Sequence, residues 1–508
     1  MFYRNEIKSK KTSSEDFSYD MLSSEQKTFE DDSVLKYKEP KIVYNFITSD
    51  GTLKSGYGFK DLSMPDDREK LDEEKVVSIR GDEIRAIWKL KWFDSIMTET
   101  DKYYLFYFND ENIVCYDNIL DKRYTTIIIQ TNYTEVPYAT YYRSDYEDGL
   151  LLSGENGELM LVRGGGTETT QNAPKILSCC THYGKLFAIT DGKRGTLAYA
   201  NDTDVLNWTD EGTQDLDFGD GRGNLNKIIS FDDYIYLFRD FGITRVSIYG
   251  KDEEFSISHM YFSDSFIYPD SIAQSGDNIY FLTASGLKVF NGSTVRDIVL
   301  DSLNVIKNCD NKNCFATCFN GKYFLACRGD FNDGLTIGCE GYEDGFINNL
   351  LFVYDIDKKH VEILRGVDIH QVLALTNPYK SKLIACFNNQ HIGRMGELTQ
   401  DGKIFEQSLS SSITFAKSDF GKPNVKKRIK SFLIKSEEDC QVTISNEEKS
   451  YTFSINGKDK IQKIRTNIVG ESFSVKIDSV VENAKISKFV LTIGQEKWKF
   501  ITEIILNW

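Results

Sequence analysis

Five of the ten cysteines lie between residues 309 and 339, which makes this the stretch of the chain richest in chemically reactive side chains. Four, three, eight and eleven residues separate Cys309, Cys314, Cys318, Cys327 and Cys339. Structural zinc sites use closely spaced cysteine pairs, and this stretch has none. Cys314 and Cys318 fall on one face of an expected strand, as buried thiols do. Ten cysteines in 508 residues are also too few for a disulfide scaffold. We therefore predict core thiols rather than a metal site.

Other residue types with chemical potential lack the spacing that a reactive site needs. The histidines, at 182, 259, 360, 370 and 391, show no paired spacing. Residues 215–223 carry three Asp and three Gly, but they lack the alternating ligands and the terminal Glu of a calcium loop. The glycines at 164–166 and at 219, 221 and 223 precede no helix and read as turns. We predict no catalytic, cofactor-binding or metal-binding residues.

The composition indicates a folded chain with a large core. Hydrophobic residues make up 40% of the chain and aromatic residues 13%. The 61 Lys and Arg against 77 Asp and Glu give a net charge of -16, which argues against a protein that grips nucleic acid by neutralising phosphates. Residues 1–14 are polar, and no window of about 18 apolar residues occurs. We expect no membrane anchor, and synthesis in a cytoplasm where the protein stays until it is assembled.

A hairpin pattern recurs seven times and determines the predicted fold. Each copy has a short alternating strand, a turn rich in Asp, Asn or Gly, and a second strand. The copies begin near residues 103, 149, 185, 234, 278, 322 and 382. This spacing is close to the ~40–50 residues of a propeller blade, and no long amphipathic helix interrupts it. We predict an all-β fold whose residues 41–404 form a β-propeller of about seven blades, with six to eight possible. An irregular set of β-sandwiches is the alternative.

The regions that flank the predicted propeller differ from it in composition. Residues 1–40 are polar and are expected to form an arm that orders only on contact. A strand at 41–46, an Asp-Gly turn and a strand at 52–54 form the expected lead-in hairpin. Residues 405–508 carry 17 Lys and Arg against 13 Asp and Glu, which leaves -20 for residues 1–404. Alternating strands in 405–508 predict a small antiparallel β-sandwich.

Several segments resemble one protein family. The ordered segments are 195–201, 204–208 with its Trp, the Phe-Gly-Asp-Gly turn at 218–221, 228–238 and 242–245; segments 46–56, 412–421 and 426–430 agree with them. Together they resemble the propeller proteins of bacteriophage tails, the nozzle or hub proteins of short-tailed phages that are also called packaged-DNA stabilisation or tail tubular proteins. The polar arm and the shorter chain depart from the larger nozzle proteins.

This resemblance implies a structural virion protein of a phage tail or neck and no enzyme activity. Such proteins form rings, commonly six-fold, below the portal and adaptor rings. They contact other tail proteins, retain packaged DNA and form its exit channel, through which genomic DNA passes without sequence-specific binding. An acidic inner wall lets DNA slide, although solubility explains the acidity equally well.

Two other functions stay open at this point. A carbohydrate-binding or glycoside-hydrolysing propeller needs exposed aromatic residues and paired carboxylates on one face, a geometry that no sequence excludes. A generic intracellular interaction scaffold is the remaining alternative.

Overall fold

The chain is nearly all β in the computed structural model. The structure describes residues 14–19, 40–49, 52–62, 84–92, 102–109, 112–116, 126–130, 133, 135–143, 148–154, 157–163, 166–170, 173–200, 205–207, 213–249, 254–307, 309–330, 345–376, 381–388, 394–479 and 484–495. The chain divides into two compact units. Unit 1 comprises Met1–Gly58, Val361–Leu364 and Gln400–Trp508, and unit 2 comprises Phe59–His360 and Arg365–Thr399. Among the described residues, no helix has the length and apolar character needed to cross a membrane.

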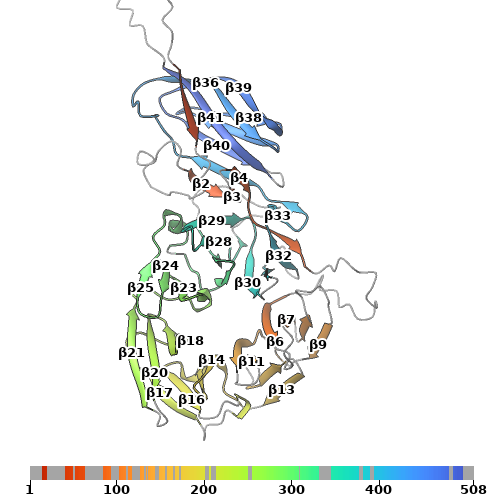
Figure 1. Ribbon diagram of the computed structural model, residues 1–508, viewed down its shortest axis with the longest axis vertical. Helices are drawn as coiled ribbons and strands as arrows, with labels where there is room; N and C mark the ends of the chain where they lie inside the picture. Colours follow the sequence, from red (N-terminus) through yellow and green to blue (C-terminus); the bar gives the residue numbers. More distant parts are fainter. Residues whose placement is uncertain are drawn as a thin grey trace, which may run out of the picture. The chain divides into compact units, whose positions relative to one another are not determined.

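Unit 2 together with residues 360–365 forms a seven-bladed β-propeller, as predicted (Figure 1). Blades 1 to 6 are four-stranded antiparallel sheets with their strands in chain order, and in blade 7 three consecutive strands are followed by a strand from the N-terminal region. Blade 1 consists of β6 (Ala86–Trp92), β7 (Lys102–Asn109), β8 (Asn112–Tyr116) and β9 (Thr126–Gln130), and blade 2 of β10 (Tyr138–Arg143), β11 (Asp148–Ser153), β12 (Leu159–Arg163) and β13 (Gly166–Thr170). Blade 3 consists of β14 (Ile176–His182), β15 (Lys185–Thr190), β16 (Thr196–Ala200) and β17 (Thr213–Asp217), and blade 4 of β18 (Leu225–Phe231), β19 (Tyr234–Arg239), β20 (Gly242–Tyr249) and β21 (Glu254–Phe262).

Blade 5 consists of β22 (Ala273–Ser275), β23 (Asn278–Thr283), β24 (Gly286–Phe290) and β25 (Val295–Asp297), and blade 6 of β26 (Phe315–Phe319), β27 (Lys322–Cys327), β28 (Leu350–Asp355) and β29 (His360–Arg365). Blade 7 contains β30 (Ile369–Thr376), β31 (Ser381–Phe387), β32 (Met395–Thr399) and β5 (Gly58–Asp61). Short 3-10 turns connect some strands: η4 (Asp191–Lys193), η5 (Val205–Asn207), η6 (Pro269–Ser271) and η7 (Asp301–Val305). The seven predicted hairpins are the second and third strands of the seven blades.

Tight turns join the first two strands of several blades. Asp232 and Asp233, between β18 and β19, have φ of 48° and 62°. Asn320 and Gly321 occupy the same place in blade 6, with φ of 47° and 70°. Positive φ at both central residues is the geometry of the two-residue hairpin turn that matches strand twist. The local preference of Asn, Asp and Gly for this conformation is why the hairpins are visible in the sequence.

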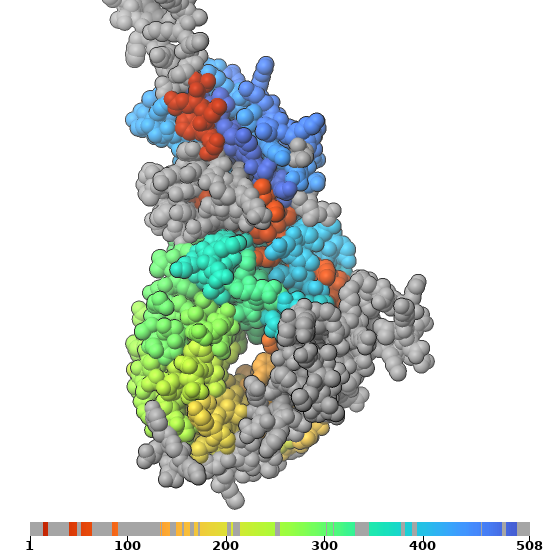
Figure 2. All heavy atoms as spheres, in the orientation of Figure 1, coloured from red at the N-terminus to blue at the C-terminus, as the bar shows by residue number. Residues whose placement is uncertain are grey.

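Neighbouring blades bury each other's faces. Leu186 and Ala188 of β15 belong to a core cluster shared with blade 2, whereas Phe187 and Ile189 belong to one shared with blade 4. Alternate side chains of a strand point to opposite faces of its sheet. The central positions of a blade's second strand are therefore apolar on both faces, as at residues 186–189 of β15. Figure 2 shows an opening on the inner side of blades 3 and 4, which are coloured yellow to light green.

The ring is closed by strand β5, whose role the sequence did not reveal. Phe59 packs edge-on against Phe387, with ring centroids 5.4 Å apart. A Cβ atom on Gly396 would lie 2.7 Å from Cβ of Phe59, so only glycine lets the two strands approach this closely. Ion pairs of Lys60 with Glu397 and of Arg394 with Asp61, at 3.3 and 3.6 Å, add to the contact.

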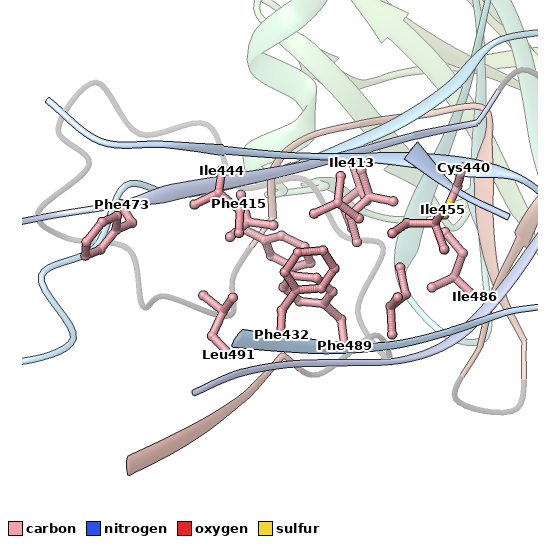
Figure 3. Packing of buried hydrophobic residues seen from close by; sticks show 14 of the residues in the cluster. Ile413, Phe415, Phe432, Cys440, Ile444, Ile455, Phe473, Ile486, Phe489 and Leu491 are labelled. Atoms are coloured by element: carbon pink, nitrogen blue, oxygen red, sulfur yellow. The ribbon is translucent and has the colours of Figure 1, made fainter. Parts of the chain in front are cut away.

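Unit 1 is a β-sandwich of two antiparallel sheets. One sheet has the order β3-β4-β41-β36-β39, with β1 also paired to β41, and the other has the order β2-β35-β40-β37-β38. Figure 3 shows Phe432, Phe489 and Ile413 among the side chains that meet between the two sheets. The strands are β1 (Ser14–Tyr19), β2 (Pro40–Tyr44), β3 (Phe46–Ser49), β4 (Thr52–Ser55), β35 (Ser411–Phe415), β36 (Lys427–Ser436), β37 (Cys440–Ser445), β38 (Ser450–Ile455), β39 (Lys458–Gly470), β40 (Ser474–Ser479) and β41 (Lys485–Gln495), with a hairpin of β33 (Lys403–Ile404) and β34 (Gln407–Ser408) before β35.

The N-terminal region differs from the sequence-based expectation. The expected strand at 41–46 is broken at Asn45, whose φ of 57° is left-handed, so β2 and β3 enter different sheets. The hairpin β3–β4, expected as the lead-in to the propeller, belongs to the sandwich, because Phe46 and Leu53 lie in its core. Part of the expected arm is strand β1, which pairs with β41, and Phe17 packs against the same core. The Asp50-Gly51 turn lies outside the described residues.

Candidate functional site

The cysteines in and next to blade 6 are core side chains. Cys314 and Cys327 are buried, and Cys309 and Cys318 are half-buried. Burial raises the pKa of the Cys318 thiol to about 12, because a thiolate is disfavoured away from water. Cys339 lies outside the described residues. Within the described ranges, no group of three or more His, Cys, Asp or Glu side chains is placed to hold a metal ion.

The described histidines lie in four different blades. Three have separate polar partners: His182 Nδ1 lies 3.2 Å from Ser230 Oγ, His259 Nδ1 lies 3.3 Å from Thr244 Oγ1, and His370 Nε2 lies 2.8 Å from the carbonyl oxygen of Arg85. His360 begins β29 in blade 6, and His391 is outside the described residues, as are Gly164, Gly165 and Trp208. The structure therefore brings together no two of the four described histidines.

The glycine-rich motif forms the loop from β17 of blade 3 to β18 of blade 4. Asp217 Oδ1 accepts a hydrogen bond from the amide of Gly219, and Asp220 Oδ1 accepts one from the amide of Arg222, both at 2.9 Å. Gly223 has a φ of +77°, and a Cβ atom there would lie 2.6 Å from Asp240 Oδ2. The motif is thus a compact turn. Glycine is required at residue 223, where the loop approaches blade 4.

Arg239, the last residue of β19, holds this loop from the inside. Its side chain is fully buried. Nη2 donates to the carbonyl oxygens of Phe218 and Gly223, both at 2.7 Å, and Nε donates to Gly223 at 3.2 Å. Nη1 lies 2.7 Å from Asp220 Oδ1. We call residues 218–224 together with Arg239 the arginine clasp, because one guanidinium satisfies several buried acceptors of the loop.

Backbone hydrogen bonds fasten the arginine clasp to both blades. The amide of Phe218 donates to the carbonyl oxygen of Gly195, in the turn between β15 and β16 of blade 3. The amide of Phe241, in the turn between β19 and β20 of blade 4, donates to Arg222. Both bonds measure 2.9 Å. The clasp therefore fixes the position of blade 3 against blade 4.

The electrostatics of the clasp favour an ionised Asp220. Burial raises the pKa of this carboxyl, but the amide of Arg222 and the guanidinium groups of Arg239 and Arg222 outweigh it, so the pKa lies below its usual value. Asp215 is also engaged, with Lys193 Nζ 3.1 Å from its Oδ2. These carboxylates serve arginine, lysine and backbone partners, which is not the arrangement that binds calcium.

Aromatic side chains are exposed beside the clasp. Phe262, at the end of β21, is 61% exposed, and the Arg222 guanidinium lies 5.7 Å from its ring centroid. Phe241 is also exposed and meets Phe266 edge-on, with centroids 6.1 Å apart. We call Arg222, Phe241, Phe262 and Phe266 the loop patch. Aromatic residues and arginine are the types enriched where proteins bind each other.

Sequence reasoning located the glycine-rich loop but not its organising residue. Arg239 directly follows the apolar run of β19, where a buried charge is rare. A charged residue at the end of a fully buried strand was the available signal. Phe262 gave no such signal, because an aromatic at the end of a strand is usually part of the core.

No protein-family model matches this chain, and no curated protein sequence matches it. Similar solved structures include BamB from Moraxella catarrhalis, with 12% identity over 62% of this chain and 99% of that chain and a TM-score of 0.35. BBS1N, in its complex with ARL6DN, has 8% identity over 61% of this chain and 91% of its own, with a TM-score of 0.39.

A third structure, KlHsv2 with a replaced loop, has 9% identity over 52% of this chain and 80% of that chain, with a TM-score of 0.29. The assignment of the fold rests on the strand order within the chain. What the fold establishes is a β-propeller protein that also carries a β-sandwich.

Proposed function

We propose that this chain is a structural virion protein of a phage tail or neck, a nozzle or hub subunit that retains packaged DNA and forms its exit channel. The observation that carries the proposal is the arginine clasp. The Phe-Gly-Asp-Gly turn and the strands after it, which carry the sequence resemblance to the nozzle family, are the parts that lock blades 3 and 4 together. A motif with this role belongs to the scaffold and not to a reaction centre.

A ring of copies requires each subunit to offer two different surfaces to its neighbours. The loop patch is one candidate surface. It presents Phe262 and Phe241 beside an arginine, and it is mounted on turns that the clasp holds rigid. Preorganised anchors of this kind lose little entropy when they bind. We infer that the loop patch contacts either a neighbouring copy or an adaptor ring.

The test is the mass of the purified protein over a concentration series, with and without a candidate portal or adaptor ring, combined with negative-stain images. Rings of about six copies, formed alone or on the adaptor, support the proposal. The variant Phe262→Asp is expected to weaken assembly at least ~10-fold, because it places a charge in an aromatic contact.

A matched control is Tyr183→Asp, which changes another exposed aromatic residue. Tyr183 is 64% exposed and lies between the first two strands of blade 3, whereas Phe241 lies between the second and third strands of blade 4, so the two turns are at opposite ends of their blades. We expect this variant to assemble like the wild type. A persistent monomer that ignores portal and adaptor rings, and that binds or cleaves glycans, would replace the proposal with the carbohydrate function.

A further inference from the structure

One sheet of the sandwich is unusually basic. The strands β36, β39 and β41, which are neighbours in that sheet, contain ten Lys or Arg and a single acidic residue, Asp459. The chain as a whole carries a net charge of -16. The cations are therefore concentrated in one place within an acidic protein.

Six of the ten cations on these strands point away from the core. Alternate positions, including Phe432, Phe489 and Leu491, fill the space between the sheets (Figure 3). Side chains between them face the other way. Six of the outward positions carry cations, and we call them the basic face: Arg428, Lys430, Lys435, Lys463, Arg465 and Lys488. Among the described residues, no carboxylate lies within ion-pair distance of Lys430, Lys463, Arg465 or Lys488.

The strand register places two of these cations directly opposite each other. Lys435 of β36 pairs with Lys488 of β41. Like charges at opposed positions of an antiparallel pair destabilise a sheet. The register therefore concentrates positive charge at this point of the basic face.

The opposite face of the sandwich shows that this charge is specific to one sheet. The outward positions of β37 and β38 carry neutral residues such as Gln441, Thr443 and Thr452. The neighbouring strand β40 adds one outward lysine, Lys476, which is paired with Asp478 at 2.9 Å, so the outward positions of these three strands carry no excess of cations.

We propose that the basic face binds the phosphate backbone of duplex nucleic acid without reading its sequence. Lysine is depleted from the centres of protein–protein interfaces, so a surface dominated by lysine fits a polyanion better than a protein. The described outward positions of the three strands carry no aromatic side chain, whereas single strands are bound through base stacking. With strands ~4.8 Å apart and ~3.4 Å per residue, the face is about 10 Å wide and about 20 Å long, which spans several successive phosphates.

The inference deepens the proposed function, on which it rests only for naming genomic DNA as the natural duplex. Binding of DNA and formation of rings are measured separately, so either can fail while the other holds. Local phosphate contacts would let an otherwise acidic ring hold DNA at defined points.

The test is fluorescence anisotropy of a labelled duplex of about 30 base pairs of arbitrary sequence, titrated with the full chain at several salt concentrations. Six phosphate contacts predict an affinity that falls about a thousandfold between 50 and 200 mM salt. A triple variant that combines Lys463→Gln, Arg465→Gln and Lys488→Gln should reduce the magnitude of the slope of log K against log salt by about 2.7. Its binding at low salt should be at least ~10-fold weaker than that of the wild type.

The matched control carries Gln441→Glu, Ser450→Glu and Thr452→Glu, which change the net charge equally but on the opposite face. It should keep wild-type affinity within about twofold, since these positions lie away from the basic face. A second measurement needs no variant: duplex should protect Lys430, Lys463 and Lys488 of the wild type from acetylation. The proposal would be overturned if DNA binding were absent or insensitive to salt, or if the control lost as much affinity as the Gln variant. It would also be overturned if the Gln variant abolished self-association of the protein while DNA binding persisted.

Discussion

The Nη1 atom of Arg239 lies 2.7 Å from Oδ1 of Asp220, and this pair joins the last residue of a blade 4 strand to the loop that arrives from blade 3. The same guanidinium donates to two carbonyl oxygens of that loop. Much of the remaining contact between blades 3 and 4 is apolar packing, which is weakly directional. The pair therefore adds a defined geometry where apolar packing alone would tolerate sliding.

Replacing Arg239 should destabilise the propeller strongly. Arg239→Met leaves the buried carbonyl oxygens of Phe218 and Gly223 without their donors, and each lost charged hydrogen bond costs about 1.5–3 kcal/mol. We expect the free energy of unfolding, measured by urea denaturation, to fall by about 3 kcal/mol or more. Arg222→Met, which removes a more exposed partner of Asp220, should cost less than about 1 kcal/mol. Equal losses in the two variants would contradict the central role of Arg239.

The Asp220 carboxyl should make stability depend on pH. Its pKa in the folded state lies below the ordinary value of about 4, so its stabilising contribution is present above that value and is lost as the pH falls through the folded pKa. The stability difference between the wild type and Asp220→Asn should be largest near neutral pH and should shrink toward about pH 3. Denaturation curves across this range measure it. A difference that does not change with pH would show that the interaction is not ionic.

The hairpins were visible in the sequence because their causes are local. Alternating apolar runs and turns such as Asp232-Asp233 and Asn320-Gly321 depend on neighbouring residues, and they disclosed seven blades. The closing strand β5 was not visible, because four residues carry little periodicity and their partner β32 is distant in the chain. For the same reason the clasp residue Arg239 was missed: its partners are set by tertiary contacts and not by spacing.

Closure of the ring should depend on the absence of a side chain at residue 396. Gly396→Ala places a methyl group 2.7 Å from Cβ of Phe59, and overpacking of this kind costs about 1–3 kcal/mol. Gly195→Ala is a suitable control, because nothing lies within 4 Å of its Cβ position. Thermal unfolding of both variants should show a lower midpoint for Gly396→Ala only. If the unfolding midpoint of Gly396→Ala were as high as that of the control, β5 would be able to shift away from the added methyl group without a loss of stability.

Phe432 should be a principal support of the sandwich. It is fully buried and meets Phe489 and Phe453, with ring centroids 5.6 and 5.4 Å apart. Phe432→Ala should lower stability by about 3–5 kcal/mol. Hydrogen exchange should show faster opening of β36, β39 and β41, with little change in blades 3 and 4. Ile461→Ala, at an exposed position of β39, should leave the exchange unchanged.

The buried thiols should resist alkylation. Burial raises the pKa of Cys318 and of Cys386 to about 12, so almost no thiolate exists at about pH 8. Peptide mapping after iodoacetamide treatment of the native protein should find both residues largely unmodified. The denatured protein should react completely within the same time. Rapid native labelling of Cys386 would indicate that blade 7 opens frequently.

Because β5 completes blade 7, the order of synthesis constrains the order of folding. Leu62 and its hydrogen-bond partner Met395 are more than 300 residues apart in the chain. At ~5–20 residues per second, the ribosome makes β5 roughly 15–70 s before β32 exists to receive it. During that interval β5 has unpaired edges with which other strands can pair. The native pairing of β5 stabilises the fold only after the long intervening chain has closed, and this closure costs entropy. Docking of β5 is thus necessarily a late event. The fraction of chains that fold correctly should depend on how well β5, the earliest propeller strand, is kept from pairing with other strands until the last blade is made.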